Sequence, residues 1–309
     1  MKINDKTVLI TGGTTGLGFE LMQQLLEQNC SVAICARTLE NLHQIKKEFP
    51  RVLTIQCDVS NEEEVQKMIK NAIDHFGKID LLINNAGIIM VGPMEAFTLE
   101  HYHKAMDVMY WGIVHTTLAI LPHMKRNNDG HIVNITSIGG KVSVPYLLPY
   151  SAAKFAAVGF SEGMAIELRK YNINVTTVVP GLMRTGSYIN ALFQKDHRLM
   201  FKLFAAASTA PFLTITAKKA ARLTLRGIKN KNTLKVLGMP AKLLIMIHHY
   251  FPEKLNRIMS ITSRFLPGSK NEHEFVQGKE IKEKFQNTEF QIFKPFARLA
   301  RNLQVSETL

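Results

Sequence analysis

The chain has 309 residues, enough to bury a sizeable core, and its 46% hydrophobic and 20% charged residues are an ordinary globular balance. No internal repeat or low-complexity segment is visible, which excludes a repeat array and favours one large domain or one domain with an extension. The net charge of +13 is unevenly placed: residues 1–190 hold 17 basic and 17 acidic side chains, whereas residues 191–309 hold 21 and 8.

The first apolar run, TVLI at 7–10, is too short for a signal peptide or a membrane span, so we expect it to be the first strand of a soluble domain. Three cysteines, Cys30, Cys35 and Cys57, lie in or beside apolar runs without metal-ligand or redox-pair spacing. We therefore expect reduced, buried thiols, a cytoplasmic protein and no metal site.

Short apolar runs typical of strands then alternate with segments of helical period. TVLITGG precedes GLGFELMQQLLEQN, SVAICAR precedes LENLHQIKKEF, and the alternation continues through a helix around 99–126 and another from about 150. Continuous apolar strands separated by helices indicate a parallel sheet that is covered on both faces. We expect a doubly wound, Rossmann-like α/β fold with a C-terminal helical extension.

The stretch TGGTTGLG follows the first strand and opens the first helix. Its glycines, Gly12, Gly16 and Gly18, permit a tight turn, close approach of the backbone to a pyrophosphate and a free helix N-terminus. A merely glycine-rich turn is the alternative, but the strand before and the helix after favour a dinucleotide site. Thr14 and Leu17 lie in the same stretch and are predicted to bind the cofactor with them.

The second strand ends in CART, with Arg37 and Thr38 where an NAD site would want an acidic residue near the ribose. Arg37 could pair with a 2′-phosphate, and no carboxylate sits at this strand tip to repel it. The alternative is a solvated surface cation. We favour NADP (NADPH) over NAD.

Two tyrosines compete for one role in the stretch SIGGKVSVPYLLPYSAAK. A helix that begins near Pro149 places Tyr150 and Lys154 four residues apart on one face, whereas Tyr146 lies before it in a loop. Tyr150 is therefore the predicted acid, and a neighbouring ammonium together with an oxidised nicotinamide would lower its pKa. Ser137 could hydrogen-bond the same substrate oxygen. The alternative is a surface pair beside a turn serine.

The chain as a whole resembles the short-chain dehydrogenase/reductase family of the Ser-Tyr-Lys type. The matching motifs, which span about residues 5–190 in the family's order, are TGGTTGLG, Asp58-Val59, the NNAG of 84–87, Ser137, the YSAAK of 150–154 and the PGLMRT of 180–185. The resemblance implies NAD(P)-dependent interconversion of a carbonyl and an alcohol. It also implies cofactor contacts by Asp58, Val59, Asn85, Gly87, Tyr150, Lys154, Pro180, Gly181 and Thr185.

In the mechanism that the resemblance implies, Tyr150 passes a proton to the carbonyl oxygen, Lys154 holds the ribose and lowers the phenol pKa, and Ser137 polarises the carbonyl. One residue departs from the family's pattern. Met109, in MDVMYWG, stands where the family usually has an asparagine whose backbone holds a water beneath the lysine. An inactive, NADP-binding scaffold or regulatory protein is therefore the alternative function.

Residues 186–215 form an irregular stretch rich in Leu, Phe, Met and Ala. We expect it to be a lid over the nicotinamide side of the cleft, opposite Tyr146, Leu147 and Leu148, and to favour a lipophilic small-molecule substrate. The alternative is that these residues belong to the core or to an interface between subunits. A homo-oligomer is expected.

Residues 1–239 are predicted to form the catalytic domain, and 240–309 a basic helical extension and tail. Two short helices are expected from Met239, and the second has apolar residues at helical spacing beside basic ones. Such helices can lie on an anionic bilayer, and peripheral membrane contact through 240–266 is one hypothesis. Packing on the body or on a second subunit is the interpretation we favour. Nucleic-acid binding is not expected, because no recognised motif accompanies the charge.

Overall fold

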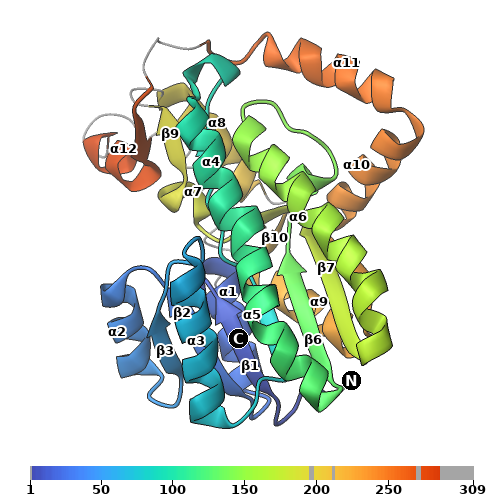
Figure 1. Cartoon of the computed structure of the whole chain (residues 1–309). Coiled ribbons are helices and arrows are strands. Elements are labelled where there is room, and N and C mark those ends of the chain that lie inside the picture. Colours follow the sequence, from blue (N-terminus) through green and yellow to red (C-terminus); the bar gives the residue numbers. More distant parts are fainter. Residues whose placement is uncertain (1, 195–197, 211–212, 269–272, 286–309) are drawn as a thin grey trace, which may run out of the picture.

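The computed structural model describes residues 2–194, 198–210, 213–268 and 273–285 (Figure 1). At its centre lies a seven-stranded sheet in which every pairing is parallel. In spatial order its strands are β11 (Leu234–Leu237), β7 (Ile173–Pro180), β6 (Gly130–Ile135), β4 (Leu81–Asn84), β1 (Thr7–Thr11), β2 (Ser31–Ala36) and β3 (Leu53–Gln56). The order reverses at β1, which confirms the predicted doubly wound α/β fold.

Helices cover both faces of this sheet (Figure 1). The first face is covered by α1 (Gly16–Leu26), α2 (Leu39–Glu48) and α9 (Ala217–Lys229), and the second by α3 (Glu62–Phe76), α5 (Gly112–Asn127) and α6 (Leu148–Glu167). All residues of β1 and β6 are buried, because their apolar side chains meet helices above and below. The core therefore has two layers separated by the sheet.

The helix predicted around 99–126 is interrupted. It consists of α4 (Leu99–Met106), a π-helical turn at Asp107–Trp111, and α5. Periodicity alone did not indicate this turn, since the apolar pattern continues through it. Single π turns occur often at functional sites, and this one contains Met109.

The lid segment is not irregular, which corrects the sequence-based expectation. It forms α7 (Ser187–Asn190), β9 (Leu192–Gln194), α8 (Arg198–Thr209) and β10 (Thr214–Thr216). Strand β9 pairs with β5 (Met90–Val91) and with β12 (Phe275–Gln277), while β10 pairs with β8 (Leu182–Arg184). Because these partners lie far away in the chain, the local sequence carried no signal for the pairing.

Two short helices follow β11, as predicted: α10 (Met239–Tyr250) and α11 (Pro252–Ser263). The chain then returns to the lid through β12 and α12 (Gly278–Phe285). Ile281 of α12 is buried in the lid's apolar cluster. In the described ranges, no helix combines the length and apolar character needed to cross a membrane. The FKPFARLARNLQ segment lies outside the described residues.

Candidate active site

The glycine-rich turn lies at the carboxyl end of β1. Gly12 and Gly16 have φ angles of +65° and +57°, in the left-handed region that favours glycine. A Cβ on Gly18 would lie 2.3 Å from the carbonyl oxygen of Gly12, so a side chain there would push the turn away from the helix. Thr15, the N-cap of α1, makes no side-chain cap hydrogen bond, which leaves the first-turn N–H groups for a ligand. This cradle fits a pyrophosphate.

Asn85 fastens the turn to the neighbouring strand. Its side-chain amide donates hydrogen bonds to the carbonyls of Thr11 (3.1 Å) and Gly12 (2.9 Å), and its backbone N–H donates to the Thr11 hydroxyl (3.0 Å). Asn85, which was predicted to line the cofactor cleft, therefore uses its side chain to hold the glycine-rich turn. Leu17 is buried in the core beneath α1, so its side chain does not face the cleft.

A cleft opens from this turn along the ends of β2 and β3. Of the predicted cofactor residues, it brings together Gly12, Thr14, Arg37, Thr38, Asp58, Val59 and Gly87. It is also lined by residues that were not predicted to bind the cofactor: Cys35, Ala36, Asn41, Cys57, Ala86, Ile88 and Val108. Asn41 lies three residues after Thr38, so its spacing along α2 could have indicated it.

Arg37 has an anionic neighbour that the sequence of its own strand did not reveal. Its Nη1 lies 4.0 Å from Oδ2 of Asp58, which comes from the end of β3. The Arg37 side chain is 55% exposed, so this long pair contributes little and leaves guanidinium donors free to bind an anion. Asp58 is oriented by Ser60, whose hydroxyl and N–H both donate to it.

The three predicted catalytic side chains meet at the carboxyl ends of β6 and β7. Ser137 follows β6, and its hydroxyl accepts a hydrogen bond from the N–H of Gly139 (3.0 Å). Tyr150 lies in the first turn of α6 and is hydrogen-bonded to Ser137. The Lys154 ammonium lies 6.0 Å from the centre of the Tyr150 ring and donates to the carbonyl of Ile135 (3.0 Å).

Burial controls the protonation of this group. It lowers the pKa of Lys154, which is only 4% exposed, from 10.5 to about 8. It raises the pKa of Tyr150, and the hydrogen bond with Ser137 offsets only part of that rise. The lowering predicted for the ammonium together with an oxidised nicotinamide stays a prediction, but the chain alone does not lower the phenol pKa. The reason is that burial disfavours the phenolate more than the neighbouring groups stabilise it.

Met109, in the π turn, lies close to the Lys154 ammonium. A Cβ on Gly87 would lie 3.8 Å from the Met109 sulfur and 3.7 Å from the Lys154 nitrogen, so both side chains flank this glycine. Met109 is fully buried. Its thioether is at best a weak hydrogen-bond acceptor, so it adds to the apolar surroundings of the ammonium.

Two residues of the PGLMRT motif, Gly181 and Thr185, contact different parts of the molecule. Thr185 faces the glycine-rich turn, since a Cβ on Gly16 would lie 3.5 Å from its Cβ. Gly181 instead packs against the C-terminal extension. Its N–H donates to the carbonyl of Leu237 (3.1 Å), and an added Cβ would lie 3.0 Å from the Cβ of Ala241 in α10. Its predicted cofactor contact is therefore left to the backbone.

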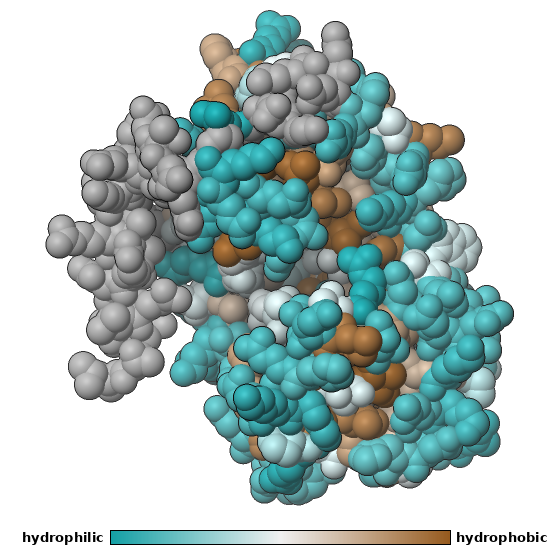
Figure 2. Space-filling view, turned by 90° about the vertical axis from the view of Figure 1, so that its left-hand side faces the viewer, coloured by the Kyte–Doolittle hydropathy of each residue, from teal (hydrophilic) through white to brown (hydrophobic). Residues whose placement is uncertain are grey.

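Apolar side chains fill the segment that was predicted to be a lid. Tyr146 and Leu147 pack on a cluster that contains Phe193 and Phe201, and the Tyr146 hydroxyl donates to the carbonyl of Pro267 (2.7 Å). Leu148 begins α6. Figure 2 shows brown apolar atoms exposed between teal surfaces in the upper half of this side of the molecule. The C-terminal return through β12 thus packs on this segment, although sequence periodicity gave no sign of it.

Comparisons with known proteins point in one direction. A family model described as short chain dehydrogenase matches residues 6–194. A 3-ketodihydrosphingosine reductase of Bacteroides thetaiotaomicron is 38% identical over 180 residues, which cover 58% of this chain and 64% of that relative. The chain thus spans a little less than two thirds of the length of such curated relatives.

Two solved structures resemble the whole architecture. A short-chain dehydrogenase from Burkholderia cenocepacia in complex with NADP has a TM-score of 0.68 at 27% identity, covering 86% of this chain and 100% of that one. A short-chain dehydrogenase/reductase from Burkholderia phymatum in complex with NAD has a TM-score of 0.74 at 22% identity, covering 82% and 96%. The second likeness concerns the fold alone.

Proposed function

The chain belongs to the short-chain dehydrogenase family, and within it we propose an NADP-dependent oxidoreductase that interconverts a carbonyl and an alcohol. The observation that carries this proposal is the convergence of Ser137, Tyr150 and Lys154 beside a glycine-rich dinucleotide cradle. NADPH, when bound, supplies the hydride. The residues of the chain then have to hold the substrate oxygen and supply its proton.

Tyr150 is the proposed proton donor. Its raised pKa keeps the phenol protonated before reaction, and the Ser137 hydroxyl beside it can share the substrate oxygen. Lys154 is the proposed positioning cation. With a pKa of about 8 it is mostly charged at neutral pH, so it can stabilise the phenolate that proton transfer leaves behind.

We propose NADP rather than NAD because the Arg37 guanidinium is exposed at the cleft and bound only loosely by Asp58. Arg37→Asp should lower the preference for NADPH over NADH by about ten- to a hundredfold, since a charge-assisted contact is lost and repulsion is added. Arg51→Asp, an equal charge change at an exposed residue outside the cleft, should leave the preference unchanged. A protein that already prefers NADH would contradict the proposal.

The proposed substrate is lipophilic. The lid presents an apolar cluster, and α8 exposes Leu199 and Leu203 by 53% and 44%. The name of one relative gives 3-ketodihydrosphingosine, a lipid, as what that protein reduces. With NADPH and matched short- and long-chain ketones, aldehydes and acyl thioesters, loss of nicotinamide absorbance should be fastest for long chains. NADPH binding without turnover of any of them would instead favour the inactive scaffold.

We further propose a homo-oligomer in a reducing, cytoplasmic compartment. Helices α5 and α6 expose Leu118 and Ile166 by 59% and 80%, and we propose these large apolar side chains as subunit contacts. The three cysteines are free and buried. Light scattering of the wild type and of Ile166→Asp tests the oligomer, because a carboxylate placed in the proposed subunit interface should dissociate it.

A further inference from the structure

Helices α10 and α11 expose many of their large apolar side chains. In α10 the buried residue is Ala241, and in α11 it is Leu255. The large apolar side chains that are at least half exposed on this segment are Met239, Leu243, Met246, Tyr250, Phe251, Ile258, Ile261 and Phe265. A surface helix ordinarily buries such residues against its own domain. Packing on the body therefore does not account for these exposed residues, whereas packing on a second subunit, the other form of the favoured interpretation, stays a prediction.

The exposed residues are ordered rather than scattered. On α10, residues 239, 243, 246 and 250 repeat at intervals of three and four and share one face. On α11, Ile258, Ile261 and, just past the helix end, Phe265 repeat at the same intervals, and Phe251, just before the helix begins, lies seven residues before Ile258. Phe265 is 84% exposed. Each helix thus presents one apolar stripe to the outside.

Basic side chains lie within and beside these stripes. Between Met239 and Gly268 the chain has four Lys or Arg residues and one acidic residue. Lys254 lies over the Phe251 ring, 5.2 Å from its centre. Arg257 lies four residues before Ile261 and Arg264 three residues after it, so both flank the apolar stripe. The surface is therefore complementary to a layer that is apolar inside and anionic at its boundary.

A second copy of the chain is a poorer complement to this surface. Docking two such faces would oppose their cations with few carboxylates available to compensate them. Long basic side chains beside apolar ones can instead extend toward lipid phosphates while the apolar residues enter the interface. Charge thus favours a lipid surface over self-association.

We propose that the outer face of α10 and α11 docks on the surface of an anionic phospholipid bilayer. The apolar stripes enter the boundary between head groups and acyl chains, and Lys254, Arg257 and Arg264 bind phosphates. Figure 1 places α11 across the end of the molecule that also carries α7 and α8, so docking brings the lid toward the lipid. The proposal is independent of the enzymatic activity, because this face lies outside the cofactor cleft.

Sedimentation of the full chain with vesicles tests the proposal. The protein should sediment with phosphatidylglycerol/phosphatidylcholine vesicles and far less with pure phosphatidylcholine, and higher salt should weaken the binding. Changing Lys254, Arg257 and Arg264 together to Gln should weaken it by about a hundredfold, from roughly a kcal/mol per basic residue near such a surface. The triple variant Ile258→Ser, Ile261→Ser and Phe265→Ser should weaken vesicle binding at low and at high salt alike, because salt does not screen apolar burial.

Helix α9 offers a matched control. Lys218, Lys219 and Arg222 are exposed there, and changing all three to Gln removes the same charge from another surface. An equal loss of binding in this control would mean bulk attraction and would overturn the proposal. So would wild-type protein that ignores anionic vesicles, or an apolar triple variant that keeps its binding. If the wild type does not bind vesicles and the apolar triple variant forms a smaller oligomer than the wild type, the face is a subunit interface instead.

Discussion

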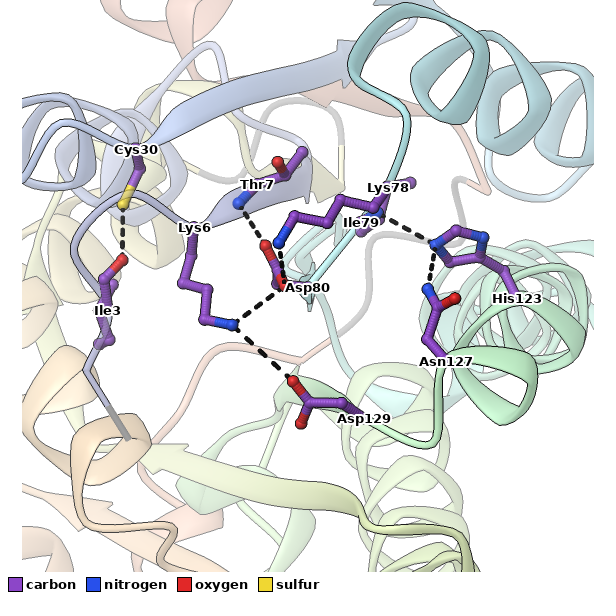
Figure 3. Close-up of polar contacts among 10 residues, drawn as sticks. All are labelled: Ile3, Lys6, Thr7, Cys30, Lys78, Ile79, Asp80, His123, Asn127 and Asp129. Carbon is purple, nitrogen blue, oxygen red and sulfur yellow. Dashed lines mark hydrogen bonds and ion pairs between the residues drawn. The ribbon is translucent and has the colours of Figure 1, made fainter.

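The edge of the central sheet where the strands begin and the edge where they end differ in how buried charges are compensated. At the edge where β1 and β4 begin, the Asp80 carboxylate accepts hydrogen bonds from the N–H of Thr7 (2.9 Å) and from the ammonium groups of Lys6 (3.1 Å) and Lys78 (3.2 Å) (Figure 3). Lys6 also pairs with Asp129 at 3.8 Å. The buried anion therefore has two cations and a backbone donor within reach.

At the opposite edge, Lys154 is as deeply buried but has far fewer partners. Within the described part of the chain, its ammonium donates to the carbonyl of Ile135, lies over the Tyr150 ring and pairs with no carboxylate. A buried charge without an opposite charge costs stability. The difference teaches that one edge compensates its buried charge and thereby stabilises the fold, whereas the other leaves a buried cation uncompensated.

The largest effect should follow from removing the phenol at the carboxyl edge. Tyr150→Phe should lower kcat by about a thousandfold, because the proposed proton donor is lost while the cleft is unchanged. NADPH binding, measured by fluorescence titration, should persist. Tyr146→Phe is the matched control, since it removes a hydroxyl that is bound to Pro267 and lies outside the proposed chemistry. Equal losses in both variants would refute the assignment of Tyr150.

A smaller effect, on stability, should follow at the amino edge. Asp80→Asn leaves Lys6 and Lys78 without their shared anion, and we expect the free energy of unfolding to fall by about 2 kcal/mol, an amount reduced by the exposure of both lysines. Urea denaturation at neutral pH measures it. Asp74→Asn, which breaks the exposed pair with Lys70, should cost less than about 0.5 kcal/mol. Comparable costs would mean that burial does not distinguish the two pairs.

The comparison predicts the opposite sign for the cation at the carboxyl edge. Lys154→Met should stabilise the cofactor-free protein by about 1 kcal/mol at pH 7, because an uncompensated buried charge is replaced by an apolar chain of similar size. The exposed substitution Lys67→Met should have little effect.

The gain should also depend on pH in a defined direction. The pKa of Lys154 is about 8 in the folded chain and 10.5 without burial, so between these values the unfolded chain binds the additional proton. From pH 8 upward the folded chain loses this proton, so the cost of the buried charge declines and is gone only above pH 10.5. The advantage of Lys154→Met should therefore shrink between pH 7 and pH 10, and an advantage that grows there would contradict this account.

The sequence predicted the parts of this architecture that depend on local pattern. Strand and helix alternation gave the doubly wound sheet, and four-residue spacing brought Tyr150 and Lys154 to one face. Features made by distant segments were missed. The Asp80 network joins residues 6, 78, 80 and 129, and Asp58 reaches Arg37 from another strand, so no window of sequence contains either.

The lid was difficult to predict for the same reason. Strand β9 has three residues and no alternation of its own, and it exists because β5 and β12 pair with it from either side. The outward orientation of the α11 stripe was also hidden, because periodicity shows that Ile258 and Ile261 share a face but not where that face points. Whether a helix face is buried depends on segments distant in the chain, which the local sequence cannot identify.

The smallest effect we predict concerns an imidazole that must stay neutral at the amino edge. His123 is buried, and its Nε2 lies 3.2 Å from the N–H of Ile79 and 3.0 Å from the amide of Asn127 (Figure 3). Only the neutral ring can accept both hydrogen bonds. Burial, and then Arg126, lower the pKa of His123, although Asp80 opposes them.

Because the folded pKa of His123 lies below the ordinary value of 6.5, the unfolded chain binds the additional proton as pH falls through 6.5. This residue's contribution to stability is therefore complete above that pH and declines below it. Between pH 7 and pH 5.5, wild type should lose at most about 1 kcal/mol relative to His123→Gln, whose amide oxygen can accept a hydrogen bond without titrating. Urea denaturation of both proteins across this range measures the difference. Parallel pH profiles would show that His123 is not what makes this edge sensitive to acid, and the contrast between the edges would then depend on Asp80 and its lysines alone.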